Sequence, residues 1–172
     1  MTGRFYEHNT YTEAKNITYQ YNRMGPLRSG AEGNNLKDRS AGTVIRYNFI
    51  LGGNRLMDLV DSEELSNESS YQKTFVYGNI LVEEDDGLNN QVIHYGGDSG
   101  NTSQYRKGTL YFYHNTLFSL RSGNTILLRL STNDKQADVR NNILIVQAAG
   151  DKLALLAESG QITIKNNMIK PD

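Results

Sequence analysis

Alternating apolar and polar residues lead into an asparagine at six places along the chain, and a short apolar segment follows each asparagine. The six asparagines are Asn22, Asn48, Asn79, Asn115, Asn142 and Asn167. In every copy the residues three positions before and two positions after the asparagine are apolar. The alternation, with its β-branched and aromatic side chains, indicates strands rather than helices. By subtraction of their residue numbers, successive asparagines stand 26, 31, 36, 27 and 25 residues apart, and such a repeat predicts a solenoid.

A further apolar segment lies between successive copies and predicts a second set of strands. The candidates are residues 5–9, 36–39, 56–60, 92–95, 127–130 and 153–156. Each coil is then a strand, a loop of variable length, a strand, an asparagine turn and a short strand. The sequence therefore predicts an all-β protein, a parallel β-helix of about six coils. At the strand spacing of about 4.8 Å the rod would be roughly 29 Å long.

The recurring asparagine has a physical explanation. A coil must turn sharply between two strands, and asparagine tolerates the left-handed backbone conformation that such a corner needs. Its amide carries donors and acceptors, so stacked asparagines can hydrogen-bond along the rod. We therefore expect an asparagine ladder, with each ladder asparagine itself in the left-handed conformation.

With this ladder the chain resembles the right-handed parallel β-helix proteins of the pectate lyase superfamily, over residues 5–169. Those proteins carry an asparagine ladder at the corner between their second and third strands. Within the superfamily, residues 35–48 (NLKDRSAGTVIRYN) are similar to a stretch of the alginate lyase and chondroitinase B group. The resemblance implies a right-handed helix, an acidic polysaccharide as partner, and an outer strand face, between long loops, along which it is bound or cleaved by β-elimination.

Composition narrows the possible functions. The 172 residues have the size of one domain, residues 1–172, and carry a net charge of −1. That balance argues against a nucleic-acid or membrane-surface role driven by bulk charge. The chain has no cysteine and no apolar run of the roughly 18–20 residues that span a bilayer. Neither end shows an amphipathic cap, so we expect a longer protein or ends that meet other chains.

One outward column of the second strand set contains Lys37, Asp58, His94 and Arg129, with Glu7 as a candidate below Lys37. Arg39 lies on the same face. The resemblance implies that basic residues here neutralise a uronate carboxylate or take the proton from the neighbouring carbon. Lys37, Arg39, His94 and Arg129 are thus the candidate catalytic residues, and Asp58 is a candidate for substrate binding. The alternative is a ladder of surface charges, with Lys37 and Asp58 as a pair worth under about 1 kcal/mol.

The match to the lyase group has two departures. The group's catalytic lysine stands nine residues before the ladder asparagine, where this chain has Arg39, with Lys37 two residues earlier. The group's catalytic arginine belongs on the next coil, where residues 56–61 offer Asp58 and no arginine. If the chain cleaves its substrate, Lys37 or Arg39 is expected as base or neutraliser.

The two longest loops, residues 62–73 and 97–108, follow the second strand set on the same side. They carry Tyr71, Tyr105, Arg106 and Lys107, which we assign as candidate substrate-binding residues. Tyrosines beside basic groups suit a groove for sugars, since rings stack on pyranose faces, and loops on a rigid scaffold often carry function. The alternative is an ordinary solvated loop.

No cofactor is required by these patterns. Residues 83–86 (EEDD) could hold Ca²⁺, because hard cations take several oxygen ligands. The run lacks the alternating spacing of an ordered calcium loop, so a solvated acidic loop is the preferred interpretation. His114, directly before Asn115, is expected to be structural.

Two hypotheses for function follow. The first is a carbohydrate-active protein, extracellular or periplasmic, that binds or cleaves an acidic polysaccharide along the column from Lys37 to Arg129. The second is a non-catalytic β-helix that serves as a surface, spike or assembly module and associates end to end or laterally.

Overall fold

Three parallel sheets build the protein. The computed structural model describes residues 4–85, 88–147, 152–157 and 159–171, and within them each sheet has six strands. The first sheet contains β1 (Thr10–Thr12), β4 (Leu36–Asp38), β7 (Met57–Leu59), β10 (Gln91–Tyr95), β13 (Thr125–Leu130) and β16 (Leu153–Leu156). The second contains β2 (Thr18–Gln20), β5 (Val44–Arg46), β8 (Lys73–Tyr77), β11 (Gly108–Tyr113), β14 (Lys135–Arg140) and β17 (Gln161–Lys165). The third contains β3 (Arg23–Met24), β6 (Phe49–Leu51), β9 (Ile80–Glu83), β12 (Thr116–Ser119), β15 (Ile143–Val146) and β18 (Met168–Pro171).

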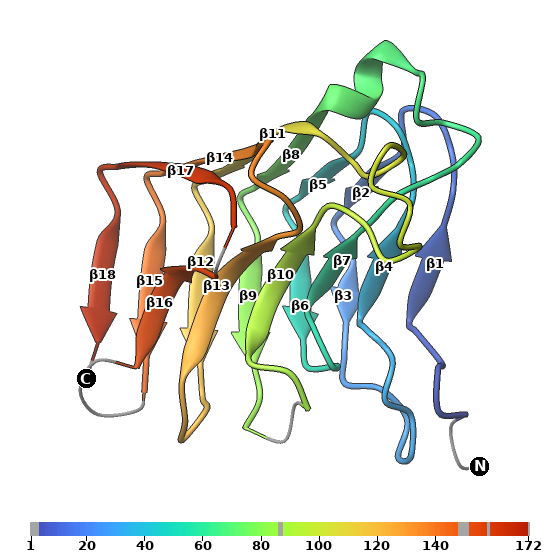
Figure 1. Ribbon diagram of the computed structural model, residues 1–172. Helices are drawn as coiled ribbons and strands as arrows, with labels where there is room; N and C mark the ends of the chain where they lie inside the picture. Colours follow the sequence, from blue (N-terminus) through green and yellow to red (C-terminus); the bar gives the residue numbers. More distant parts are fainter. Residues whose placement is uncertain (1–3, 86–87, 148–151, 158, 172) are drawn as a thin grey trace.

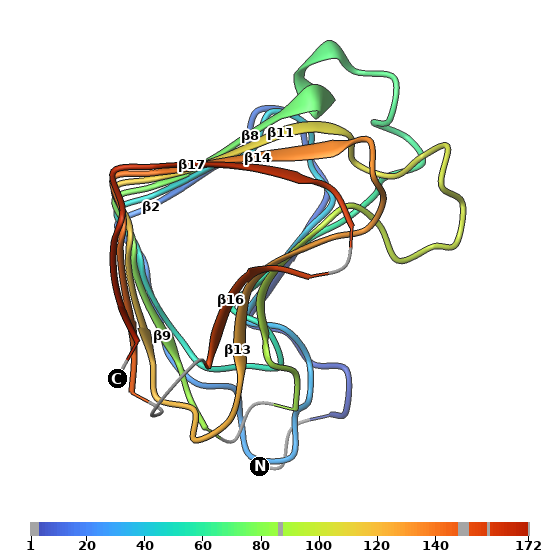
Figure 2. The same cartoon turned by 60° about the vertical axis from the view of Figure 1, so that its left-hand side comes forward.

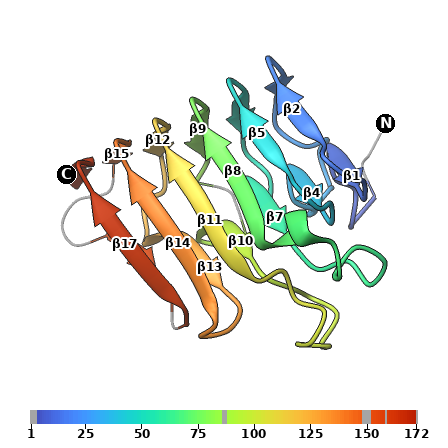
Figure 3. The same cartoon turned by 90° about the horizontal axis from the view of Figure 1, so that it is seen from above.

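The chain is a parallel β-helix of six coils, as the sequence predicts. Each coil contributes one strand to every sheet, and each strand pairs in parallel with its counterpart in the next coil (Figure 1). Figure 2 looks along the stack from the C-terminal coil, and there the chain turns counterclockwise as it advances toward the viewer, which makes the helix right-handed. Seen from above, the second sheet runs unbroken from β2 to β17 (Figure 3).

The core consists of the apolar columns that flank the asparagines. In the column three residues before the asparagine, Ile45, Val76, Phe112 and Val139 are fully buried. The column two residues after it is equally buried in the inner coils, whereas Ile169 in the last coil is 40% exposed. Each fully buried side chain of this size contributes about 1.5–3 kcal/mol relative to an exposed one.

The asparagine ladder is present over all six coils. The side-chain Nδ2 of each ladder asparagine donates to Oδ1 of the next, and that Oδ1 also accepts the main-chain N–H of the preceding ladder asparagine. The Nδ2–Oδ1 distances along the ladder are 2.9, 3.0, 2.9, 3.2 and 2.8 Å. Each Nδ2 after the first coil also reaches a main-chain carbonyl of the coil before, so the buried amides are satisfied.

The left-handed corner lies one residue earlier than the sequence suggested. At the six corners the residue before the ladder asparagine has a positive φ between 53° and 67°: Tyr21, Tyr47, Gly78, His114, Asn141 and Asn166. The ladder asparagine must point its amide into the stack, so the residue before it makes the turn. The expectation that the ladder asparagine is left-handed is wrong, and the structural role expected for His114 is confirmed.

The first coil also differs from the prediction. Its first-sheet strand is β1, not residues 5–9. Glu7 instead lies in a turn, where its carboxylate accepts the N–H of Arg4 at 3.0 Å and lies 3.3 Å from Arg28. The residue that pairs with Lys37 is Tyr11. The β-branched threonines on both sides of Tyr11 favour a strand at this place.

Two long loops rise on the same side of the rod, as expected (Figure 1). One connects β7 to β8 and includes the 3₁₀ helix η1 (Ser69–Gln72), and the other connects β10 to β11. Both begin where first-sheet strands end, so they flank the outward face of that sheet. Within the described ranges, no helix has the length and apolar character needed to cross a lipid bilayer.

Candidate functional site

The outward column of the first sheet is aligned as the sequence predicts. Lys37 pairs with Asp58, Asp58 with His94, and His94 with Arg129 in successive strands. Tyr11 precedes Lys37 in the same column. Residues from five coils therefore form one line along the rod, at the foot of the two long loops.

Most of this column is buried, unlike the surface ladder that the sequence also allowed. Lys37 is 9% exposed, and Asp58 and His94 are each 3% exposed, whereas Arg129 is exposed. The cause is the loop after β10, which brings Asp98 to Lys37 across 61 residues of sequence.

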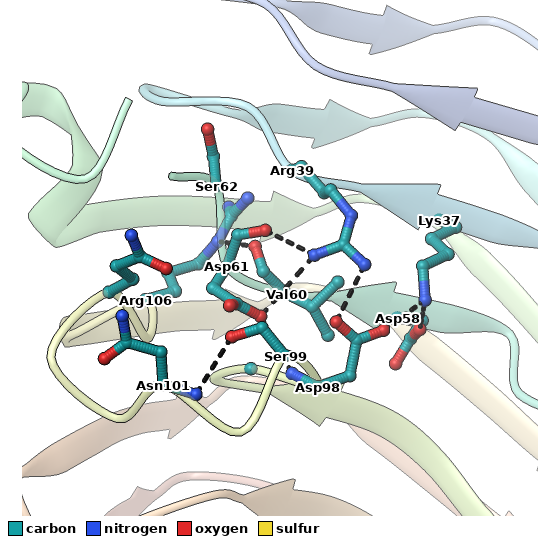
Figure 4. A network of polar contacts seen from close by, with 12 residues as sticks. Lys37, Arg39, Asp58, Val60, Asp61, Ser62, Asp98, Ser99, Asn101 and Arg106 are labelled. Carbon is teal, nitrogen blue, oxygen red and sulfur yellow. Dashed lines mark hydrogen bonds and ion pairs between the residues drawn. The ribbon is translucent and has the colours of Figure 1, made fainter. Parts of the chain in front are cut away.

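Lys37 and Arg39 are held in a network of ion pairs (Figure 4). The Nζ of Lys37 lies 2.9 Å from Oδ2 of Asp58 and 2.5 Å from Oδ2 of Asp98. The guanidinium of Arg39 donates to the other oxygen of Asp98 at 2.7 Å and to the main-chain oxygen of Asp61 at 2.5 Å. Asp98 thus bridges the two cations and ties the loop after β10 to β4. Buried pairs of this kind are costly to break, because the remaining charge keeps no partner.

The network keeps its members ionised. Burial opposes the charge of Lys37, but Asp58 and Asp98 outweigh it and raise the pKa of Lys37. Burial likewise opposes the charge of Asp58, yet hydrogen bonding to His94 and the charge of Lys37 lower the pKa of Asp58. The pKa of Arg39 is raised too, since its hydrogen bonds to Tyr11 and Asp98 outweigh burial. Lys37 and Arg39 are therefore fixed cations that hold their protons.

Two of the predicted loop residues do not line an open surface. Tyr71 is 2% exposed and Arg106 1%. Arg106 lies 3.1 Å from Oδ2 of Asp38, and its Nη1 donates to Oγ1 of Thr74 at 3.1 Å. The hydroxyl of Tyr71 donates to the main-chain oxygen of Gln104 at 3.0 Å. Arg106 thus anchors its loop to the rod, whereas Tyr71 ties the two long loops together, since its hydroxyl also accepts the N–H of Ser62.

The other two loop residues remain partly exposed. Lys107 lies 3.4 Å from Asp134, and the ring of Tyr105 lies 5.2 Å from the Nζ of Lys135. They stand at the margin of the face on which Arg129 lies, and the structure leaves their assigned role in substrate binding a prediction.

The described residues of the acidic run, 83–85, do not gather their carboxylates at one point. Glu83 is 6% exposed and accepts hydrogen bonds from Ser119 at 2.6 Å and Thr125 at 2.9 Å inside the rod. Burial raises the pKa of Glu83 to about 7. Asp86 lies outside the described residues, among which no group of three or more acidic or histidine side chains could hold a metal ion. Calcium binding at this loop stays a prediction.

Sequence reasoning missed Arg55, which precedes β7. Its Nη2 donates to Oε1 of Gln91 at 2.9 Å, while its Nε is buried with no acceptor among the described residues. Burial lowers the pKa of Arg55; the charge of Asp58 opposes this shift, the charge of Arg129 adds to it, and the charge of Asp98 opposes it. Neither arginine forms an ion pair within the described part of the chain. The position of Arg55 at the start of a first-sheet strand was the only available signal.

Sequence reasoning also missed Ser131. His94 hydrogen-bonds Oδ1 of Asp58 through Nδ1 at 2.8 Å and Oγ of Ser131 through Nε2 at 2.7 Å. Ser131 lies two residues after Arg129, and period-two alternation places both on the outward face. That spacing was a readable signal, because it puts a hydroxyl beside the histidine of the neighbouring coil.

Comparisons with known proteins give no match: no family model, no curated protein sequence and no solved structure resembles the chain. The site therefore has to be interpreted from its own geometry.

Proposed function

We propose that the protein binds an acidic polysaccharide along the outward face of the first sheet, from Tyr11 to Arg129. The observation that carries the proposal is that the guanidinium groups of Arg55 and Arg129 form no ion pair within the described residues. The Nε of Arg55 is buried without an acceptor, and Arg129 is exposed. A carboxylate from a ligand would give these groups the acceptor that they lack.

Guanidinium groups suit this ligand. A guanidinium binds a carboxylate through two parallel N–H···O bonds, and such charge-assisted bonds are roughly twice as strong as neutral ones. A uronate polymer presents carboxylates at regular intervals, and the rod presents strands at about 4.8 Å. At the other end of the face, Tyr11 is 55% exposed and offers a ring on which a sugar can stack.

The geometry favours binding over β-elimination. An elimination base must accept a proton, and Lys37 and Arg39 hold theirs through Asp58, Asp98 and Asp61. Membership in the pectate lyase superfamily, or in its alginate lyase and chondroitinase B group, is part of the proposal and is supported by the right-handed helix and its ladder. An extracellular or periplasmic location belongs to it as well, because such polymers lie outside the cytoplasm.

Affinity electrophoresis in gels containing polygalacturonate, alginate or chondroitin sulfate tests the proposal, with neutral dextran as the reference. We expect retardation by at least one acidic polymer and none by dextran. Arg129→Ala should weaken binding about tenfold or more, since a charge-assisted bond contributes about 1.5–3 kcal/mol. The matched control is Arg140→Ala in the second sheet, which should bind as the wild type does. No retardation by any acidic polymer, or equal loss in both variants, would refute the proposal.

A specific observation favours a second function, self-association. Three apolar side chains in one outward column of the third sheet are exposed: Ile80 by 46%, Ile143 by 39% and Met168 by 57%. An assembly module would bury them against another copy. Sedimentation velocity over a hundredfold concentration range tests this, and a concentration-independent monomer would exclude it.

A further inference from the structure

Three side chains from three successive coils form one hydrogen-bonded chain. Asp58 lies in β7, His94 in β10, and Ser131 directly after β13. The distances are 2.8 Å from Asp58 Oδ1 to His94 Nδ1 and 2.7 Å from His94 Nε2 to Ser131 Oγ. An acid, a base and a hydroxyl in this order form the arrangement that activates a serine.

The surroundings fix the direction of the chain. Asp58 is an ionised acceptor, since its Oδ2 takes hydrogen bonds from Lys37 at 2.9 Å and from Asn34 at 2.8 Å. Its Oδ1 therefore accepts a hydrogen bond from the N–H at Nδ1 of His94, which leaves Nε2 as the acceptor for the hydroxyl of Ser131. The other acceptor near that hydroxyl, the main-chain oxygen of Gly97, lies farther away at 3.4 Å.

The serine is the only one of the three that a ligand can approach. Asp58 and His94 are each 3% exposed, while Ser131 keeps partial exposure at the carboxyl end of its strand. The column thus buries the acid and the base, whereas the serine is partly exposed.

Two glycines bring a main-chain donor to the hydroxyl. The N–H of Gly97 lies 3.1 Å from Oγ of Ser131. A Cβ on Gly96 would lie 2.3 Å from that Oγ, and a Cβ on Gly97 would lie 2.2 Å from the ring of Tyr105. Only glycine allows this approach. An N–H so close to Oγ is a candidate donor to the oxyanion that forms when Ser131 attacks a carbonyl carbon.

We propose that Ser131 is a nucleophile that hydrolyses carboxylic esters with a small acyl group. Ser131 Oγ bonds to the ester carbonyl carbon while its proton passes to Nε2 of His94. The carbon–oxygen bond to the alcohol then breaks, and His94 returns the proton to the departing alkoxide. Water then attacks the acyl carbon and gives a proton to Nε2 of His94. The bond between that carbon and Ser131 Oγ breaks, His94 returns the proton to Oγ, and the carboxylic acid leaves. Asp58 is a positioning residue throughout.

Gly96 and Gly97 pack tightly against the hydroxyl of Ser131, which limits the size of the acyl group that fits beside it. Arg129, exposed and two residues before Ser131 on the same face, offers a cation for an acidic alcohol portion of the ester. The reaction itself does not depend on polysaccharide binding, and a small ester without a sugar is sufficient to test it.

The test labels the wild-type protein with a serine-reactive alkyl fluorophosphonate and locates the adduct by peptide mass spectrometry. A serine protease treated in parallel confirms that the reagent is active. We expect a single adduct at Ser131, its loss in Ser131→Ala, and no change in the exposed control Ser103→Ala. A wild-type protein without an adduct at Ser131, or with equal labelling of many serines, would overturn the proposal.

Hydrolysis of p-nitrophenyl acetate gives an independent measurement. Ser131→Ala should lower the rate about a thousandfold, and Ser103→Ala should leave it unchanged. In Asp58→Asn the inflection of the pH–rate profile should move to lower pH, because a neutral amide no longer stabilises the imidazolium. A structural role for the three residues would move neither quantity. Equal rates in wild type and Ser131→Ala would refute the inference and leave polysaccharide binding untouched.

Discussion

Replacing Asn79 by leucine tests the ladder at its centre. The Asn79 side chain accepts the N–H and the Nδ2 of Asn48 at 2.9 and 3.0 Å, and it donates to the main-chain oxygen of Ile45 at 3.0 Å. Asn79 is 1% exposed, so water cannot replace these partners. Leucine leaves at least one buried donor and one buried acceptor without a partner.

The expected loss of stability follows from the two main-chain groups that lose a partner, the N–H of Asn48 and the carbonyl oxygen of Ile45. Each orphaned buried group costs about 1–3 kcal/mol, so the free energy of unfolding should fall by about 4 kcal/mol. For a chain of this length 1 kcal/mol moves Tm by about 2–4 °C, and we expect a fall of about 10 °C. The exposed loop variant Asn124→Leu is the control and should keep the wild-type Tm.

Thermal unfolding followed by circular dichroism measures this change. Amide hydrogen exchange adds a local readout, because the N–H of Asn48 loses its acceptor and should exchange faster in Asn79→Leu. Equal Tm values for wild type and Asn79→Leu, with unchanged protection at Asn48, would show that the ladder does not stabilise the stack.

Three further perturbations test other parts of the structure. Burial raises the pKa of Glu83 from 4.5 to about 7. The protonated carboxyl therefore makes its full contribution to the stability of the fold below pH 4.5, and this contribution is lost as the pH rises through about 7. Glu83→Gln should therefore be more stable than wild type at pH 8, by on the order of 3 kcal/mol, and parallel Tm–pH curves from pH 4 to 8 would contradict this. Arg106→Met should lower the free energy of unfolding in urea by about 3–5 kcal/mol, because the buried carboxylate of Asp38 loses its partner. Lys107→Met, at a partly exposed position, should lower it little. Similar losses in both variants would argue against an anchoring role for Arg106. Gly78→Ala should lower the free energy of unfolding by about 1–2 kcal/mol, since φ is +67° and its Cβ would lie 2.6 Å from the ring of Tyr47; an unchanged urea midpoint would show that this corner tolerates a side chain.

The fold could be predicted from the sequence because the solenoid repeats one local rule. Every coil places apolar residues at the same distances from its asparagine, and six copies fix the register between neighbours. The alignment of Lys37, Asp58, His94 and Arg129 follows from that register. The position of the corner was missed for a physical reason. Asparagine tolerates positive φ and also has an amide that can form the ladder, so the sequence suggests that one residue does both. In the structure the ladder asparagine points its amide inward, and the residue before it makes the turn.

The loops could not be predicted in the same way, since their contacts join residues far apart in sequence. Arg106 reaches Asp38 across 68 residues, and Lys37 reaches Asp98 across 61. No repeat relates these positions, and each loop occurs once. A basic residue in such a loop can bind a ligand or pair with a buried carboxylate of the protein. The sequence does not show which, because the difference lies in whether the side chain is buried.

Asp58 shows why the buried column and the site have to be considered together. One of its oxygens accepts from Lys37 and Asn34, and the other accepts from His94. The first set keeps Asp58 ionised in a place where burial opposes the charge. An ionised Asp58 then holds the proton of His94 on Nδ1 and turns Nε2 toward Ser131. The ion pair between Lys37 and Asp58 thus has two effects. It holds the proton on Lys37, so that Lys37 cannot serve as the base in β-elimination, and it keeps Asp58 ionised, so that Asp58 orients His94 toward Ser131.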